Sequence, residues 1–165
     1  MTDQRVDPPL VADEKATLTG FLDFHRDTFL WKIDGLSPDQ LRIAACPPSD
    51  LTLWGLLRHL AEVDRGWFHD FDGDDLPPLY CTEADPEGDL VVPVDADFDE
   101  DLAIFRSICE RSRQIVAAHS LDDQQVTPKR TYSLRWILVH LIEEYARHNG
   151  HADLLRQAID GATGE

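Results

Sequence analysis

The feature that most constrains this chain is the recurrence of apolar residues at spacings of three and four along four separate segments. That period places the apolar side chains on one face of an α-helix. It predicts four long helices, over residues 10–33, 52–71, 98–119 and 133–159. Helices with one apolar face each bury those faces against one another. We therefore expect an all-α fold, an antiparallel four-helix bundle that forms a single domain over residues 1–165.

The connections between these segments are rich in proline, glycine and aspartate. Two adjacent prolines end a head over residues 1–9 that we expect to be flexible. The longest connection, residues 76–97, has no helical period and should act as the one long crossover loop. A loop of this length in a compact domain is either a surface crossover or a lid, and we favour the crossover. Within it, the apolar run 90–94 is compatible with a short strand, although a proline interrupts that run.

The charge of the chain argues against several classes of partner. The 32 acidic and 15 basic residues give a formal net charge of -17. A surface this acidic repels phosphate backbones and anionic lipid, so we expect neither nucleic-acid nor membrane binding. Cys46, Cys81 and Cys109 are far apart and form no CxxC pair, which favours a reducing compartment. With no signal peptide and no membrane-spanning run visible, we expect a cytoplasmic location.

The most informative string is HLIEEYARHNGHADLLR, which starts at His140 in the fourth predicted helix. At ~100° per residue, His148 falls in the middle of the apolar arc and Glu144 lies one turn earlier on its shoulder. Residues four apart on a helix lie ~5–6 Å apart at Cβ. A buried carboxylate needs a partner. A divalent cation bound by both side chains would supply one, and an ion pair or hydrogen bond between them is the alternative.

A second helix should contribute to such a metal site, because two ligands leave an ion undercoordinated. The best donor is His59, on the shoulder of the apolar face of the helix over 52–71; the alternative is a surface histidine. Two histidines and one glutamate are typical of catalytic zinc sites with an open position. The same ligands suit nickel and non-haem iron. The sequence thus predicts a metal site made of His59, Glu144 and His148, with zinc as the first choice.

Three further histidines are candidates for supporting roles. His140 and His151 flank the arc that contains His148, so we expect them at the rim or behind the ligands. His25 lies in the apolar stripe of the first predicted helix, as a core histidine, a residue behind the ligands or a fourth ligand. A fourth protein ligand would favour a structural rather than a catalytic site. The tryptophans are interpreted as packing residues.

Two strings, LWGLLRHLAEVDRGWF and WILVHLIEEYARHNGHADLLR, resemble the DinB-like superfamily of metal-binding four-helix bundles. The resemblance covers nearly the whole chain. Many members carry His-x-x-x-His-Arg-Gly-Gln in the last helix. Here Glu144 replaces the first histidine, and Asn149 and His151 replace the arginine and glutamine. The resulting His, Glu, His set is similar to that of mycothiol-dependent maleylpyruvate isomerase, a member of the superfamily.

The resemblance implies a function based on thiol chemistry. It implies a divalent ion at one end of the bundle, near a cavity, that activates a low-molecular-weight thiol such as mycothiol or bacillithiol. The partners would be that thiol and an electrophilic substrate, and a homodimer is compatible with exposed bundle faces. The expected activity is a metal-dependent thiol S-transferase, ahead of a hydrolase. A non-catalytic metal-binding or stress-response module is the alternative, because fold does not fix function.

Overall fold

In the computed structural model, which describes residues 5–74, 76–128 and 130–163, the chain is mostly helical, and this confirms the predicted class. The elements in chain order are α1 (Glu14–Ile33), α2 (Pro38–Leu41), α3 (Leu53–Asp72), α4 (Phe98–Ala118), β1 (Gln124–Val126), β2 (Thr131–Ser133) and α5 (Leu134–Asp160). No helix among these described residues is long and apolar enough to cross a membrane.

Capping residues set where the long helices begin and end. The side chains of Asp13, Thr52, Asp97 and Ser133 each accept a hydrogen bond from a backbone N–H of the first helical turn. Such caps satisfy N–H groups that have no partner within the helix. Because Asp13 is a cap, α1 begins four residues later than its apolar pattern predicts. Gly161, with φ of 78°, ends α5 in the left-handed conformation that glycine adopts readily.

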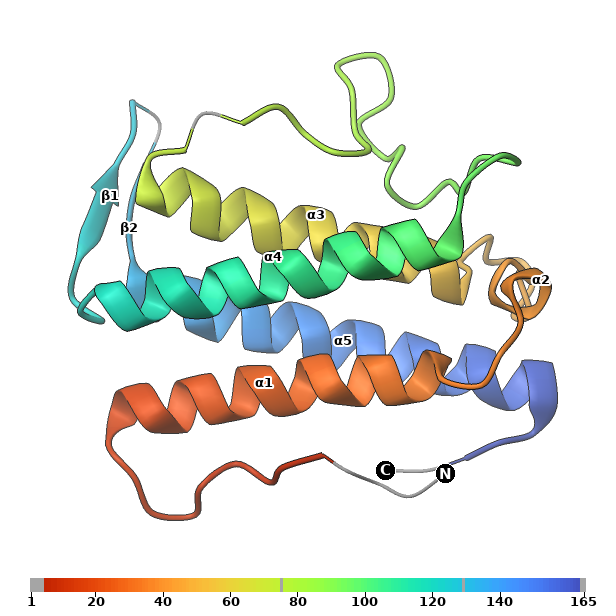
Figure 1. The fold of residues 1–165 in the computed structure, drawn as a ribbon, viewed down its shortest axis with the longest axis horizontal. Coiled ribbons are helices and arrows are strands. Elements are labelled where there is room, and N and C mark those ends of the chain that lie inside the picture. The colour runs from red at the N-terminus through yellow and green to blue at the C-terminus, as the bar shows by residue number, and fades with distance from the viewer. Residues whose placement is uncertain (1–4, 75, 129, 164–165) are drawn as a thin grey trace.

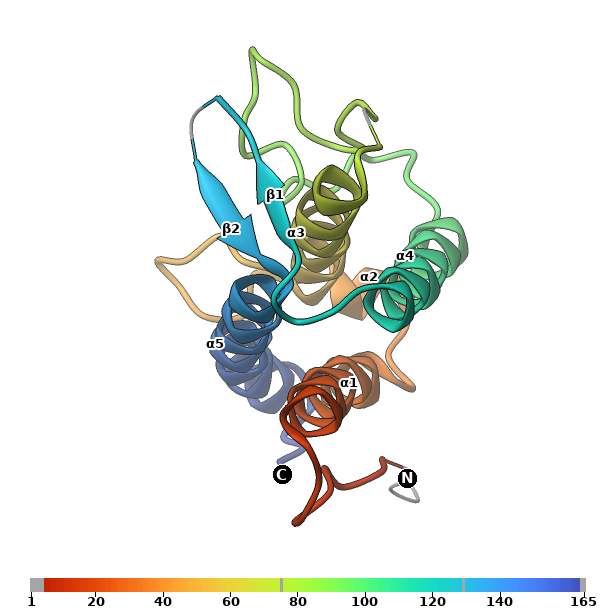
Figure 2. The same cartoon turned by 90° about the vertical axis from the view of Figure 1, so that its left-hand side faces the viewer.

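The four long helices lie side by side (Figures 1 and 2). Following the colours, α1 and α5 run in one direction and α3 and α4 run in the other. Seen end-on, α3 lies between α4 and α5, and α5 lies between α3 and α1. Residues 76–97, which we call the crossover segment after the expectation above, lie along the outside of α3, and α4 runs parallel to α3.

A buried polar network joins all four long helices. Asp64 of α3 is fully buried and accepts hydrogen bonds from Arg26 of α1, Ser112 of α4 and Tyr145 of α5. The Arg26 Nη2 to Asp64 Oδ2 distance is 2.6 Å, and the Tyr145 hydroxyl lies 3.0 Å from the same oxygen. A buried carboxylate is tolerated where a charged partner and further donors surround it. The network therefore fixes the helices relative to one another within the apolar core.

Two local features differ from the sequence-based expectation. The antiparallel hairpin of β1 and β2, with Gln125 opposite Tyr132, was not predicted because its strands are only three residues long. The run 90–94 is not a strand but turn and irregular backbone. This run rests on α3: a Cβ added to Gly55 would lie 2.4 Å from the carbonyl oxygen of Leu90. At this point the run therefore packs against a helix and is not part of the β1–β2 sheet.

The start of the chain was predicted to be a flexible head over residues 1–9. Residues 1–4 lie outside the described residues. The part that follows runs back along α1, where the Arg5 guanidinium donates a hydrogen bond to the Thr28 hydroxyl at 3.0 Å. The same guanidinium lies over the ring of Trp31, 4.5 Å from its centroid.

Candidate metal centre

The three residues predicted to bind a metal lie together between α3 and α5. One ligand atom from each of His59, Glu144 and His148 lies within 4.8 Å of the others. The rings of His59 and His148 are 4.7 Å apart at their centroids, and His148 Nε2 lies 3.5 Å from Glu144 Oε2. These separations allow the three side chains to reach one ion.

The helices explain why these side chains converge. Glu144 and His148 are one turn apart on α5, and His59 reaches them from α3, which packs beside α5. The His148 side chain is 11% exposed, that of Glu144 13% and that of His59 21%. The resemblance implied a site at one end of the bundle, but Glu144 and His148 lie near the middle of α5. The three side chains therefore meet between α3 and α5, part-way along the bundle.

The electrostatics of His148 favour a neutral ligand. Burial, aided by the nearby His59 and His151, lowers the pKa of His148 to about 4. A neutral imidazole has a free lone pair, as metal binding requires. The same pKa argues against the alternative in which Glu144 and His148 form an ion pair at neutral pH. Glu144 has a cationic neighbour in Arg147, whose Nη1 lies 3.2 Å from its Oε1, but that side chain is 54% exposed.

Asp89 is the residue that the sequence analysis missed. It lies in the crossover segment, is 6% exposed, and its Oδ2 is 2.8 Å from Nδ1 of His59. A carboxylate at this position holds the proton on Nδ1 and leaves Nε2 of His59 as the ligand atom. Asp89 is 30 residues from His59 in an aspartate-rich segment, so no spacing in the sequence could identify it.

Further contacts hold the crossover segment beside His59. Glu62, on α3, accepts hydrogen bonds from the backbone N–H groups of Leu79 and Tyr80, both at 2.8 Å. The Tyr80 hydroxyl donates to Asp101 at the start of α4, also at 2.8 Å. Burial and the Asp101 carboxylate raise the pKa of Tyr80, so the phenol remains a donor. Asp89 is therefore part of an anchored loop.

Two of the three cysteine thiols, those of Cys81 and Cys109, do not offer a ready nucleophile. Burial raises the pKa of Cys81, in the crossover segment, and raises that of Cys109, in the helical core, to about 12. Both are therefore protonated at neutral pH, whereas the thiolate is the reactive form. Neither of these two thiols is therefore suited to act as the nucleophile.

Of the supporting histidines, His151 and His140 lie next to the predicted ligands. His151 Nδ1 is 3.3 Å from His148 Nδ1, so it can orient that ring. His140 forms a second group of possible ligands with Glu143 and Glu144, and its ring stacks on Trp136 with centroids 4.9 Å apart. A supporting role for His140 and His151 stays a prediction.

His25, the third supporting histidine, contacts Asn149 of α5. Its backbone carbonyl accepts a hydrogen bond from Asn149 at 3.0 Å, and burial lowers its pKa. Within the parts of the chain that the structure describes, neither His25 nor His151 belongs to a group of possible metal ligands. The geometry therefore offers three protein donors rather than four.

Comparison with known proteins identifies the family. A family model described as Mycothiol-S-transferase matches residues 17–161. The chain belongs to the Mycothiol-S-transferase family. This is a DinB-like family, so the resemblance drawn from the two helix strings is confirmed. Membership of the Mycothiol-S-transferase family and the histidine and glutamate group together indicate a mycothiol-related, metal-dependent enzyme.

The other comparisons bear on the fold alone. No curated protein matches this chain. A crystal structure of a conserved protein from Enterococcus faecalis is similar, with a TM-score of 0.69 over 92% of this chain and 100% of that chain. The identity of 14% limits that likeness to architecture. The chemistry of this member of the Mycothiol-S-transferase family is therefore inferred from its own residues.

Proposed function

We propose that this protein is a metal-dependent S-transferase that activates a low-molecular-weight thiol of the mycothiol type. His59, Glu144 and His148 would hold the divalent ion. The observation that supports this is the convergence of two imidazoles and one carboxylate, from two helices, within 4.8 Å of one another. These are the donors of open catalytic zinc sites, and they also suit nickel or iron. When bound, the ion would lower the pKa of a coordinated thiol.

The chain's own residues would then prepare the site. Asp89 keeps the proton of His59 on Nδ1 and would leave Nε2 as the ligand atom. His148 is neutral at physiological pH and can bind without losing a proton. His151 lies against the far nitrogen of His148 and restrains its ring. With three protein donors, a coordination position remains for the thiol sulfur, which would attack an electrophilic partner.

We also propose that the helices form the four-helix bundle expected of the DinB-like superfamily, with residues 76–97 as the single crossover. The parallel directions of α3 and α4 support this arrangement, because only a long connection can join two parallel neighbours. A crossover in this place brings Asp89 to His59. The topology thereby contributes to the site.

The proposal is tested by thiol conjugation. The purified protein is incubated with mycothiol and monobromobimane, with and without a chelator, and the bound metal is quantified. We expect about one divalent ion per chain and a rate that the chelator abolishes. His148→Ala should lose both the metal and the activity, whereas His119→Gln, a histidine change at the far end of α4, should keep both.

Two results would contradict the proposal. One is full conjugation activity in protein that carries no metal. The other is a bound metal whose removal unfolds the protein while no thiol-dependent turnover is found; that result would favour the non-catalytic metal-binding module.

A further inference from the structure

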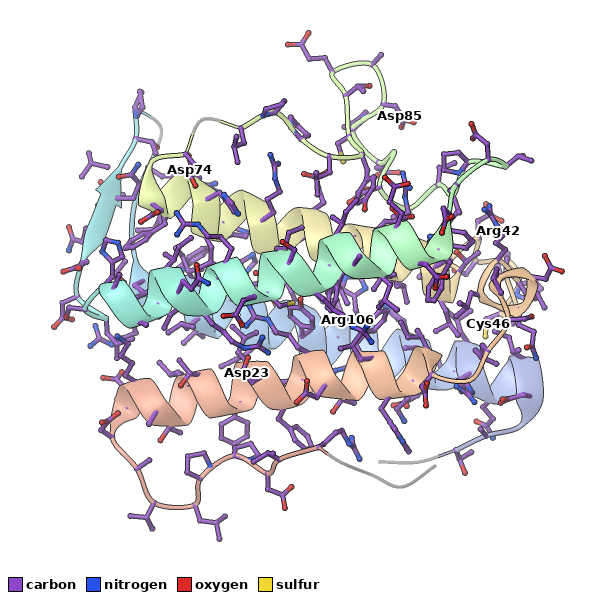
Figure 3. The ribbon with its side chains drawn as sticks, viewed as in Figure 1. Asp23, Arg42, Cys46, Asp74, Asp85 and Arg106 are labelled. Atoms are coloured by element: carbon purple, nitrogen blue, oxygen red, sulfur yellow. The ribbon has the colours of Figure 1, made fainter. Side chains whose placement is uncertain are left out.

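A hollow that the metal centre does not use lies at the end of α3 beside the β1–β2 hairpin. Its volume is about 560 Å³. Asp74, labelled in Figure 3, lies on its wall next to the hairpin. The side chains that matter for what it binds are Val63, Arg65, Trp67 and Arg130. The hollow thus combines apolar and cationic walls.

The hollow begins one helical turn from the proposed ligands. Val63 and Trp67 follow His59 on α3 by four and eight residues, about 6 and 12 Å along the helix axis at 1.5 Å per residue. On α5, His140 precedes Glu144 by one turn, and its ring lies 5.0 Å from that of Trp67. An elongated molecule could therefore lie in the hollow with one end at the metal centre.

Arg130 gives the far part of the hollow an anion-binding group. Its guanidinium lies over the Trp67 ring, 4.3 Å from the centroid, and 5.4 Å from the centroid of Tyr132. Across the described ranges, no carboxylate forms an ion pair with Arg130. The acidic residues of the hollow have other partners: Asp70 accepts a hydrogen bond from the Tyr132 hydroxyl.

Asp74, the second acidic residue of the hollow, also has ion-pair partners. Asp74 pairs with His69 at 3.0 Å and with Arg111 at 3.5 Å. Deeper in the wall, Arg65 is 8% exposed, and its carboxylate neighbour Glu62 is 3.8 Å away. Two guanidinium groups therefore face a hollow whose carboxylates are already paired.

We propose that this hollow binds the electrophilic substrate and selects one that carries a carboxylate, which Arg130 pairs with. A guanidinium binds a carboxylate through two parallel N–H donors, and a lysine cannot reproduce that geometry. Val63 and Trp67 would cover the apolar body of the molecule between its carboxylate and its reactive carbon. This inference rests on the proposed transferase function, since it assigns the reactive end to the metal centre.

Binding is tested first, without any reaction. Biphenyl-4-carboxylate is titrated into the protein by calorimetry, with biphenyl-4-methanol as the uncharged counterpart. We expect Arg130→Gln to weaken binding of the carboxylate by about tenfold or more and to leave the alcohol unchanged. Arg106→Gln, an exposed change on α4 with the same loss of charge, should bind both as the unaltered protein does. Equal affinity of Arg130→Gln and the unaltered protein for the carboxylate would overturn the inference.

Turnover is tested next, with 4′-(bromomethyl)biphenyl-4-carboxylate and its methyl ester as acceptors and mycothiol as the thiol. The thiol sulfur forms a bond to the benzylic carbon, bromide leaves with the electron pair of the C–Br bond, and the thiol proton passes to solvent. Arg130→Gln should raise KM for the acid by about tenfold and leave KM for the ester unchanged. An equal effect on both acceptors would contradict carboxylate selection.

The binding and turnover experiments together distinguish a failure of this inference from a failure of the proposed function. If the protein transfers thiol to neither acceptor, the proposed function fails, while the calorimetric comparison still decides whether Arg130 recognises a carboxylate.

Discussion

At the scale of single residues, the hydrogen bond between Asp89 and His59 is the contact most specific to the proposed chemistry. Replacing Asp89 by asparagine keeps the size and removes the charge that holds the His59 proton on Nδ1. Loss of such a partner costs about 10–100-fold in metal affinity. We expect Asp89→Asn to weaken zinc binding by this factor in competition with a chromogenic chelator.

The matched control is Asp95→Asn, an exposed aspartate of the same crossover segment. It removes the same charge and should leave zinc affinity unchanged. Equal affinities for both variants would mean that Asp89 does not orient His59.

The lowered pKa of His148 predicts how the metal-free protein responds to acid. The pKa is about 4 in the folded chain and near 6.5 when unfolded, so the unfolded state binds the extra proton first. The stabilising contribution is therefore complete above about pH 6.5 and is lost as the pH falls toward 4. In urea titrations with chelator present, the free energy of unfolding should fall more steeply over this range than in His148→Gln. Parallel curves would contradict this.

Single residues also show how much of the candidate site could be predicted from the sequence. Glu144 and His148 could be found because a helix repeats every 3.6 residues, so their spacing alone puts them on one side. His59 could be found only as a candidate, since its partners are on another helix. Asp89 and Arg130 could not be found, because irregular segments carry no period from which to infer where a side chain points.

At the scale of elements, the crossover segment depends on a few contacts for its position. The Tyr80 hydroxyl donates to Asp101, which also accepts hydrogen bonds from Trp54 and Arg58. Removing one such hydrogen bond costs about 0.5–1.5 kcal/mol. We expect Tyr80→Phe to lower stability by about 1 kcal/mol and to speed amide exchange in residues 79–90.

Amide exchange in α5 serves as the internal reference for this variant, because α5 lies away from Tyr80. Uniformly faster exchange in both regions would show that the substitution destabilises the whole protein. Unchanged exchange in residues 79–90 would show that Tyr80 does not anchor the segment.

The helices were predictable as elements, whereas the short strands were not. Each long helix has both a repeating apolar face and a capping residue at its start, such as Thr52 or Ser133. For α3, α4 and α5 these two independent signals agree on where the helix begins, whereas in α1 the cap Asp13 lies inside the predicted range. The hairpin has three residues per strand, too few for an alternating pattern to show. The run 90–94 was compatible with a short strand, but Val91 and Val94 are exposed and the backbone of Leu90 packs against Gly55 of α3 instead of pairing in a sheet.

At the scale of the whole molecule, Asp64 links the four long helices through one buried carboxylate. Removing it leaves the buried Arg26 guanidinium without its main partner. Breaking a buried ion pair in this way costs about 3–5 kcal/mol. We expect Asp64→Ala to lower the free energy of unfolding by this amount in urea denaturation.

Ser112→Ala removes a single neutral donor to the same carboxylate and should cost about 1 kcal/mol. A cost for Asp64→Ala no larger than that for Ser112→Ala would show that the charge pair does not hold the helices together.

The measurement that tests the central claim most directly is X-ray absorption at the zinc edge of protein loaded with one zinc per chain. The account predicts two imidazole nitrogens and oxygen ligands. Addition of mycothiol should replace one oxygen by a sulfur at about 2.3 Å. His59→Ala should lose one imidazole from the spectrum. A zinc ion that lacks imidazole ligands, or one that takes up no sulfur when the thiol is added, would contradict the account.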